Sequence, residues 1–148
     1  MHSHVSIILF AVLALVSTSL QLGINCEGQY FCKNIFTKGA EIGELIGHLD
    51  GIPDEVFYED GEQVVCTKQS WHLFFHDTRI CAMMHNSRGA TVGEMKVWIR
   101  RIQDHDCGKC GAVPILPGNN VETGQFKVDY VEGGCDTGIC RARSLGPL

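Results

Sequence analysis

The residues with the clearest chemical potential are two cysteines, Cys107 and Cys110, in the stretch HDCGKCG. A Cys-x-x-Cys pair can be a redox couple, half of a zinc site, or two neighbouring halves of two different disulfides. The sequence has no second Cys-x-x-Cys, and no His pair follows this one at zinc-finger spacing. The choice among these chemistries therefore depends on the compartment, because disulfides form and persist where conditions are oxidising.

The N-terminus indicates an oxidising compartment. Residues 1–19 contain no Lys, Arg, Asp or Glu, and they include an apolar run over Ile7–Val16. Ser17 and Ser19 are small residues, spaced as they are before a signal-peptidase site. We therefore predict a signal peptide over residues 1–19 and a secreted, extracellular protein.

The predicted mature chain forms one domain over residues 20–148, with a short tail over residues 136–148. An uncleaved anchor is the alternative, because His2 and His4 stand where Lys or Arg is usual. The apolar run is short for a bilayer-spanning helix, and no later stretch approaches the required length. We therefore expect no membrane insertion.

All cysteines of the chain follow the predicted signal. They are Cys26, Cys32, Cys66, Cys81, Cys107, Cys110, Cys135 and Cys140. An even number of cysteines in a small secreted chain is typical of a disulfide framework, here of four bridges. Eight cysteines allow 105 pairings, so spacing alone leaves the connectivity open.

Composition excludes several kinds of partner and reaction. The formal net charge of −5 opposes nonspecific binding to nucleic acid or anionic lipid. No signature of a nucleophile with an activating base is present, so we expect a protein without enzymatic activity or cofactor. His72, His76, Asp77 and His85 could converge on a metal ion, but a polar solvent-facing surface is the simpler interpretation, and we predict no metal site.

Two amphipathic helices are expected to position the cysteines. Apolar residues recur with helical spacing over residues 37–49, and Gly51 and Pro53 follow as a stop signal. The second helix is predicted over residues 91–103, where Thr91 and Glu94 have the spacing of a capping box. Residues 52–61 are acidic and rich in turn formers, which predicts a surface loop.

Alternation over residues 71–76 and 126–130, β-branched and aromatic content, and short connections together predict the strands of an antiparallel sheet. A short strand is expected near residues 22–26, and longer ones are expected over residues 62–68, 71–76, 79–85 and 126–130. Pro114, Pro117 and the run Gly118–Asn120 predict an irregular loop before the last strand.

Two segments of the sequence resemble the killer-protein-four type of killer toxin, found in smut-fungus viruses and in secreted fungal relatives. One is Leu22–Cys26 with Cys32 six residues on, and the other is HDCGKCG followed by Gly118–Val121, Gly124–Phe126 and Val128–Val131. The resemblance implies an α+β fold, in which two antiparallel helices pack on one face of an antiparallel sheet. It also implies a secreted toxin that inhibits growth by interfering with calcium channels. We expect a monomer whose partner is a cell-surface protein.

The resemblance further implies bridges Cys26–Cys107, Cys32–Cys110 and Cys66–Cys135, which leaves Cys81–Cys140. An anionic target would have to be bound by a local basic patch, because the net charge opposes long-range attraction. The candidate cations are Lys68, Lys96, Arg100, Arg101 and Lys109. The alternative function is a secreted effector or structural binding protein that keeps the scaffold without killing.

Overall fold

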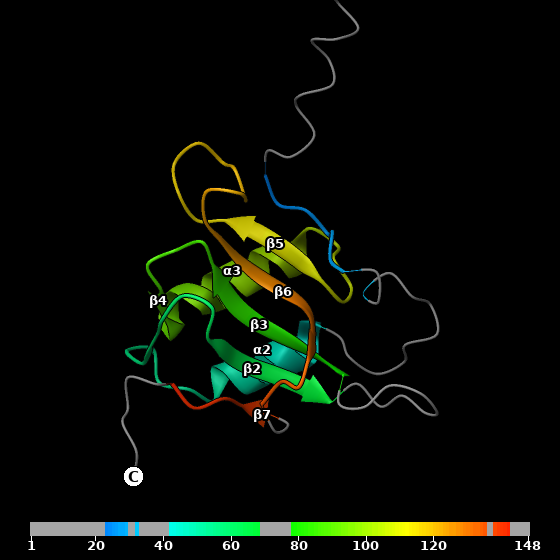
Figure 1. Cartoon of the computed structure of the whole chain (residues 1–148), viewed down its shortest axis with the longest axis vertical. Coiled ribbons are helices and arrows are strands. Elements are labelled where there is room, and N and C mark those ends of the chain that lie inside the picture. The colour runs from blue at the N-terminus through cyan, green and yellow to red at the C-terminus, as the bar shows by residue number, and fades with distance from the viewer. Residues whose placement is uncertain (1–22, 30–31, 33–41, 69–77, 136–137, 143–148) are drawn as a thin grey trace, which may run out of the picture.

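A five-stranded antiparallel sheet runs through the centre of the structure, a computed structural model that describes residues 23–29, 32, 42–68, 78–135 and 138–142 (Figure 1). The strand order is β5-β6-β3-β2-β7. The strands are β2 (Gln63–Lys68), β3 (Thr78–His85), β5 (Gly111–Pro114), β6 (Gln125–Glu132) and β7 (Gly138–Ile139). A separate short pair joins β1 (Phe57–Tyr58) to β4 (Ala90–Thr91).

Two helices, α2 (Ile42–Asp50) and α3 (Val92–Asp104), cover one face of this sheet and lie behind it in Figure 1. The start of α3 follows from the capping box, because the Thr91 hydroxyl accepts from the Glu94 amide and the Glu94 carboxylate accepts from the Thr91 amide. Helix α2 ends before Gly51, as expected. Residues 37–41 of the first predicted helix lie outside the described residues.

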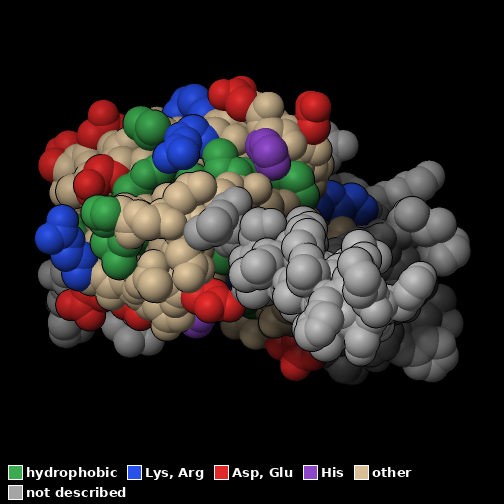
Figure 2. Space-filling view, turned by 90° about the horizontal axis from the view of Figure 1, so that it is seen from above, with side chains coloured by type: hydrophobic (Ala, Val, Ile, Leu, Met, Phe, Trp, Pro, Cys, Tyr) green, Lys and Arg blue, Asp and Glu red, His purple; other side chains and the backbone are tan. Residues whose placement is uncertain are grey.

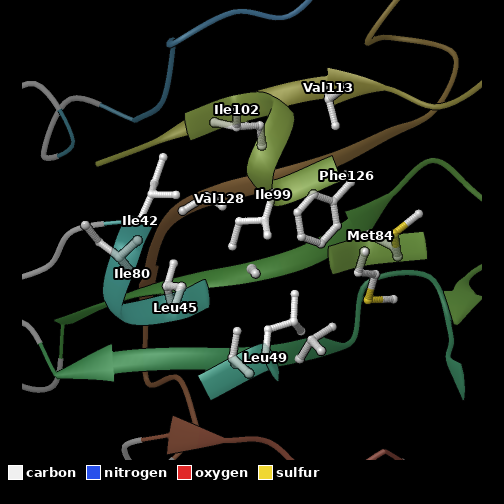
Figure 3. Packing of buried hydrophobic residues seen from close by; sticks show 14 of the residues in the cluster. Ile42, Leu45, Leu49, Ile80, Met84, Ile99, Ile102, Val113, Phe126 and Val128 are labelled. Atoms are coloured by element: carbon white, nitrogen blue, oxygen red, sulfur yellow. The ribbon is translucent and has the colours of Figure 1, made fainter. Parts of the chain in front are cut away.

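The core fills the space between the helices and the sheet. Because side chains alternate along a strand, every second residue of β3 and β6 points toward the helices. Figure 3 shows Ile42, Leu45 and Leu49 of α2 and Ile99 and Ile102 of α3 packed against Ile80, Met84, Val113, Phe126 and Val128 of the sheet. The fold is thus the predicted disulfide-rich α+β fold.

The N-terminal segment is fastened to the edge of the sheet. Asn25 and Ala112 exchange backbone hydrogen bonds of 3.0 and 2.9 Å, and the Gln29 amide donates to the buried Asp129 carboxylate at 2.9 Å. Gly111 allows the close approach, since a side chain there would come within 2.8 Å of the Asn25 carbonyl oxygen. The predicted strand over residues 22–26 is therefore a single bridge at Asn25 in the described part.

Two disulfides lock this arrangement, and they are the pairs that the resemblance implied. Cys26 is bonded to Cys107 and Cys32 to Cys110, so the Cys-x-x-Cys motif contributes one sulfur to each of two bridges. Both bridges tie the N-terminal segment to the connection between α3 and β5. The motif is therefore two neighbouring halves of two different disulfides, and not a redox couple or half of a zinc site.

The other two predicted bridges are wrong. The structure pairs Cys66 with Cys81 and Cys135 with Cys140, whereas Cys66–Cys135 and Cys81–Cys140 were expected. The reason is strand register, since Cys66 and Cys81 lie directly opposite each other on β2 and β3, with their Cα atoms 4.1 Å apart.

The long predicted strands are confirmed, while short strands were missed. β2, β3 and β6 match the strands predicted over residues 62–68, 79–85 and 126–130. β5 occupies residues directly after Cys110, β1 lies in the predicted surface loop, and β7 lies in the predicted tail. The predicted strand over residues 71–76 and the predicted signal over residues 1–19 lie outside the described residues. Within the described part, no helix is both long and apolar enough to cross a membrane.

Candidate binding surface

Helix α3 carries three of the five cations predicted to bind a target, and its residues divide into three faces. The buried face packs into the core and consists of Val92, Met95, Ile99 and Ile102. The second face, Lys96 and Arg100, lies toward the segment that follows α2. The third face, called here the outer face, consists of Glu94, Val97, Trp98 and Arg101, whose helical spacing places them in one stripe.

The second face is used to hold the fold together. Arg100 Nη2 donates to both carboxylate oxygens of Asp50, at 2.6 and 2.8 Å. Lys96 Nζ donates to the Ile52 carbonyl at 2.8 Å and to Asp54 Oδ1 at 2.5 Å. These contacts fasten the last residue of α2 and the loop after it to α3. The positive charges of Lys96 and Arg100 are therefore already balanced by the Asp54 and Asp50 carboxylates.

The outer face combines apolar and cationic groups. Val97 is 59% exposed, which is high for a large apolar residue. The Trp98 ring is partly exposed and packs on Phe126, with ring centroids 5.9 Å apart. Arg101 is exposed and makes no side-chain ion pair or hydrogen bond within the part of the chain that the structure describes. Among the described residues, this face thus exposes an apolar side chain and a cation side by side.

A cleft of about 430 Å³ adjoins the outer face. It lies between the turn after β3, the first turns of α3 and the segment after β5. Its lining includes Arg88, Glu94, Trp98 and Leu116, and Leu116 is 43% exposed. Buried Trp and Arg side chains carry much of the energy in many protein interfaces, and partly exposed ones beside a cleft are suited to become buried on binding.

Two predicted cations lie off this helix. Lys68 ends β2, and its side chain lies outside the described residues. Lys109 lies between Cys107 and Cys110 and is partly buried. Figure 2 shows that, on the face it displays, Lys and Arg side chains are interspersed with acidic and apolar ones. The structure therefore does not bring the five predicted cations into a single described patch.

Groups of metal-ligating residues in the described part involve disulfide sulfurs. The two such groups are Cys66 with Cys135 and Cys140, and Cys32 with Cys110 and Asp129. All five cysteines in them are oxidised, whereas metal coordination uses the thiolate form. Of the four residues weighed as a histidine metal site, His85 is exposed and His72, His76 and Asp77 lie outside the described residues.

Sequence reasoning missed Arg88, Val97 and Leu116. Arg88 was part of a polar turn, and Leu116 was part of an irregular loop between two prolines. Val97 carried a usable signal, since it is an apolar residue on the polar side of an amphipathic helix. The cleft is lined by three segments that are distant in sequence, and periodicity within one segment does not predict that they lie together.

Comparison with known proteins gives a family. No curated protein matches the chain. The model of the Kp4 family matches residues 9–132, which is most of the chain and includes both helices, the outer face and six of the eight cysteines. The chain therefore belongs to the Kp4 (killer protein 4) family of toxins.

Proposed function

We propose that this protein is a secreted growth inhibitor that acts by stoichiometric binding to a cell-surface protein, a calcium channel in susceptible cells. Membership of a toxin family supports the growth-inhibitory part. Four disulfides in a small domain support action outside the cell, because such bridges persist in oxidising surroundings. The protein would bind as a monomer, without turnover and without entering the membrane.

The observation that carries the proposal is the outer face of α3. It presents an exposed apolar residue, Val97, beside a cation, Arg101, that has no ion pair among the described residues, on a helix held rigidly by the core and by ion pairs. Rigid presentation lowers the ordering cost of association. An acidic target such as a channel mouth would be recognised by this local positive charge despite the negative net charge.

A dose series of purified, oxidised protein on growing fungal and plant cells tests this function. We expect growth arrest that added calcium relieves, while reduced and alkylated protein at the same doses is inactive. Arrest that calcium does not relieve would contradict the channel target. Absence of arrest at every dose would contradict growth inhibition itself.

A second candidate is a secreted effector that kept the scaffold and lost killing. The pairing of Lys96 and Arg100 with Asp54 and Asp50 favours it, because fewer cations remain available for an anionic target. In that case the cleft beside Trp98 would bind a different partner. Capture of a host surface protein without growth arrest would support this candidate.

A further inference from the structure

Two disulfides are in contact on the sheet face opposite the helices. Cys66–Cys81 joins β2 to β3, and Cys135–Cys140 joins the segment after β6 to the residue that follows β7. The Sγ atoms of Cys66 and Cys140 are 3.5 Å apart, although they belong to different bridges. The Sγ atoms of Cys66, Cys135 and Cys140 all lie within 4.8 Å of one another. A thiolate formed at Cys140 would therefore lie against the neighbouring bridge.

One of these bridges can be reached from solvent. A cleft of about 420 Å³ is lined by Cys135 and Cys140 together with Gln63, Glu62 and Arg141. Cys135 is partly exposed, whereas Cys140 is buried. Cys66 and Cys81 are both fully buried. A small thiol entering the cleft can thus meet Cys135 but not the Cys66–Cys81 bridge.

Gln63 connects the two bridges and keeps them in place. Its Oε1 atom accepts from the Cys135 amide at 2.9 Å and lies 3.7 Å from Cys66 Sγ. The Cys140 amide donates to the Val64 carbonyl at 2.9 Å. These contacts hold the outer bridge against β2, so the short distance between the sulfurs is built into the fold.

We infer that Cys135–Cys140 is a thiol–disulfide exchange site for a small-molecule thiol, and that it relays exchange to the buried Cys66–Cys81 bridge. Exchange proceeds by attack of a thiolate on a disulfide sulfur, and access decides which sulfur is attacked. Arg141 lines the same cleft and supplies positive charge toward a thiolate or a thiol's carboxylate, while Glu62 supplies a negative charge there. The inference does not depend on growth inhibition.

The first step adds the thiol to the protein. The incoming thiolate attacks Cys135 Sγ, the bond between Cys135 and Cys140 breaks, and Cys140 leaves as a thiolate. In the second step the Cys140 thiolate attacks Cys66 Sγ, the bond between Cys66 and Cys81 breaks, and Cys81 leaves as a thiolate. Each step forms one S–S bond and breaks one, so no further oxidant or reductant is needed.

The relay changes which strands are linked. Before it, a covalent bond joins directly opposed residues of β2 and β3. After it, the new Cys66–Cys140 bond joins β2 to the end of β7, Cys135 carries the thiol, and Cys81 is a buried free thiol. The product is therefore a modified protein with a different internal link and one new thiol.

Incubation of the oxidised protein with reduced glutathione, followed by quenching with N-ethylmaleimide and peptide mapping, tests this relay. We expect a glutathione adduct on Cys135 together with a Cys66–Cys140 peptide. Cys26 is also exposed, so glutathione can react there, but no new pairing should follow at Cys26 or Cys107. Full thiolation of Cys135 with an intact Cys66–Cys81 bridge would overturn the inference.

Two paired variants sharpen the result. With Cys135→Ala and Cys140→Ala together, opening of Cys66–Cys81 by glutathione should be at least about tenfold slower than in the wild type, because the attacking thiolate is missing. With Cys26→Ala and Cys107→Ala together, formation of the Cys66–Cys140 peptide should be unchanged. Equal opening rates in the first variant and the wild type would contradict the relay. If the first variant fails to fold, the wild-type peptide map alone decides.

Discussion

At the scale of single residues, Tyr58 shows how a buried polar group couples stability to pH. Its ring is buried, and its hydroxyl donates a 2.6 Å hydrogen bond to the Cys140 carbonyl. Burial, and secondarily the negative charge of Glu62, raises the pKa of the Tyr58 phenol above its ordinary value of 10.0. The folded state therefore holds the Tyr58 proton more tightly than the unfolded state does.

This difference predicts a loss of stability at high pH. The contribution is fully present below the unfolded pKa of about 10 and is lost as pH rises through the folded pKa. Brief denaturant unfolding at pH 8 to 11 should show a fall in the free energy of unfolding above pH 10, and the fall should be shallower in Tyr58→Phe. Tyr130→Phe, which keeps Tyr58, should retain the steeper fall. Identical pH profiles for the wild type and Tyr58→Phe would contradict this cause.

The same substitution also tests the hydrogen bond. At pH 7, Tyr58→Phe leaves the Cys140 carbonyl without its donor in a buried position, so we expect a cost of about 1–2 kcal/mol in the free energy of unfolding. Equilibrium denaturation measures it. A cost near zero would mean that the bond makes no net contribution to stability.

The residue types of α3 were predictable, but their partners were not. Periodicity placed Lys96, Arg100 and Arg101 on the polar side of the helix. Periodicity could not show that Arg100 forms an ion pair and Arg101 does not. The ion pair depends on the position of Asp50 in the folded protein, which the pattern of α3 does not contain. The difference of one helical position, about 100° of rotation, decides which arginine is bound within the protein.

At the scale of elements, the start of α3 depends on a local signal. Thr91 and Glu94 satisfy each other's backbone amides at the N-terminus of the helix. We predict that Thr91→Ala lowers the free energy of unfolding by about 1 kcal/mol, which is the usual cost of losing such a cap.

Thr123→Ala serves as the matched control for Thr91→Ala. The Thr123 hydroxyl donates only to the Asn120 carbonyl in an exposed turn, so its removal should cost less than about 0.5 kcal/mol. Chemical denaturation of both variants gives the comparison. Equal costs for the two threonines would show that the capping box does not stabilise the helix beyond an ordinary surface contact.

Strands and helix ends with a recognisable local sequence pattern were predictable. Short strands that form only because they pair with a neighbouring strand were not. β3 and β6 are eight residues each; β6 alternates, and β3 contains an apolar run over residues 80–84, so the sequence of each segment is enough to mark it as a strand. β5 and β7 have four and two residues, too few to show a period. They are strands because β6 and β2 offer unpaired backbone groups beside them. The capping box was predictable because it is contained within four residues.

At the scale of the whole molecule, disulfide connectivity shows the limit of inference from resemblance. Three of the sulfurs on one sheet face lie within 4.8 Å of one another, so several pairings fit the same strands. The choice depends on register, and a slip of one residue would turn Cys66 to the other face. Cys26–Cys107 and Cys32–Cys110 lie at the opposite edge of the sheet, away from these three sulfurs, so their pairing is not ambiguous in this way.

The bridges should differ in their contribution to stability. Removing both N-terminal bridges, Cys26–Cys107 and Cys32–Cys110, with sequence separations of 81 and 78, should cost more than about 4 kcal/mol, because only the loss of both frees the long loop in the unfolded chain. Removing Cys135–Cys140, with a separation of 5, should cost about 2 kcal/mol. Denaturation of the variant that lacks both N-terminal bridges and of the variant that lacks Cys135–Cys140 measures the order. A larger cost for the short loop would contradict this entropic account.

In the proposed function, the whole molecule binds its target through one face of one helix. Arg100 and Arg101 are adjacent and change the net charge equally when replaced by Glu, so they form a matched pair. Arg100→Glu places a negative charge beside Asp50 and should cost about 0.5–1 kcal/mol of stability. Arg101→Glu breaks no described side-chain contact and should leave stability nearly unchanged.

The most direct test of this account is the dose for half-maximal growth inhibition by these two variants and the wild type. We predict that Arg101→Glu raises this dose at least about tenfold, corresponding to about 1.4 kcal/mol of binding free energy. Arg100→Glu, at a temperature where it remains folded, should stay within about threefold of the wild type. Equal doses for Arg101→Glu and the wild type, or a larger loss for Arg100→Glu, would contradict binding through the outer face of α3.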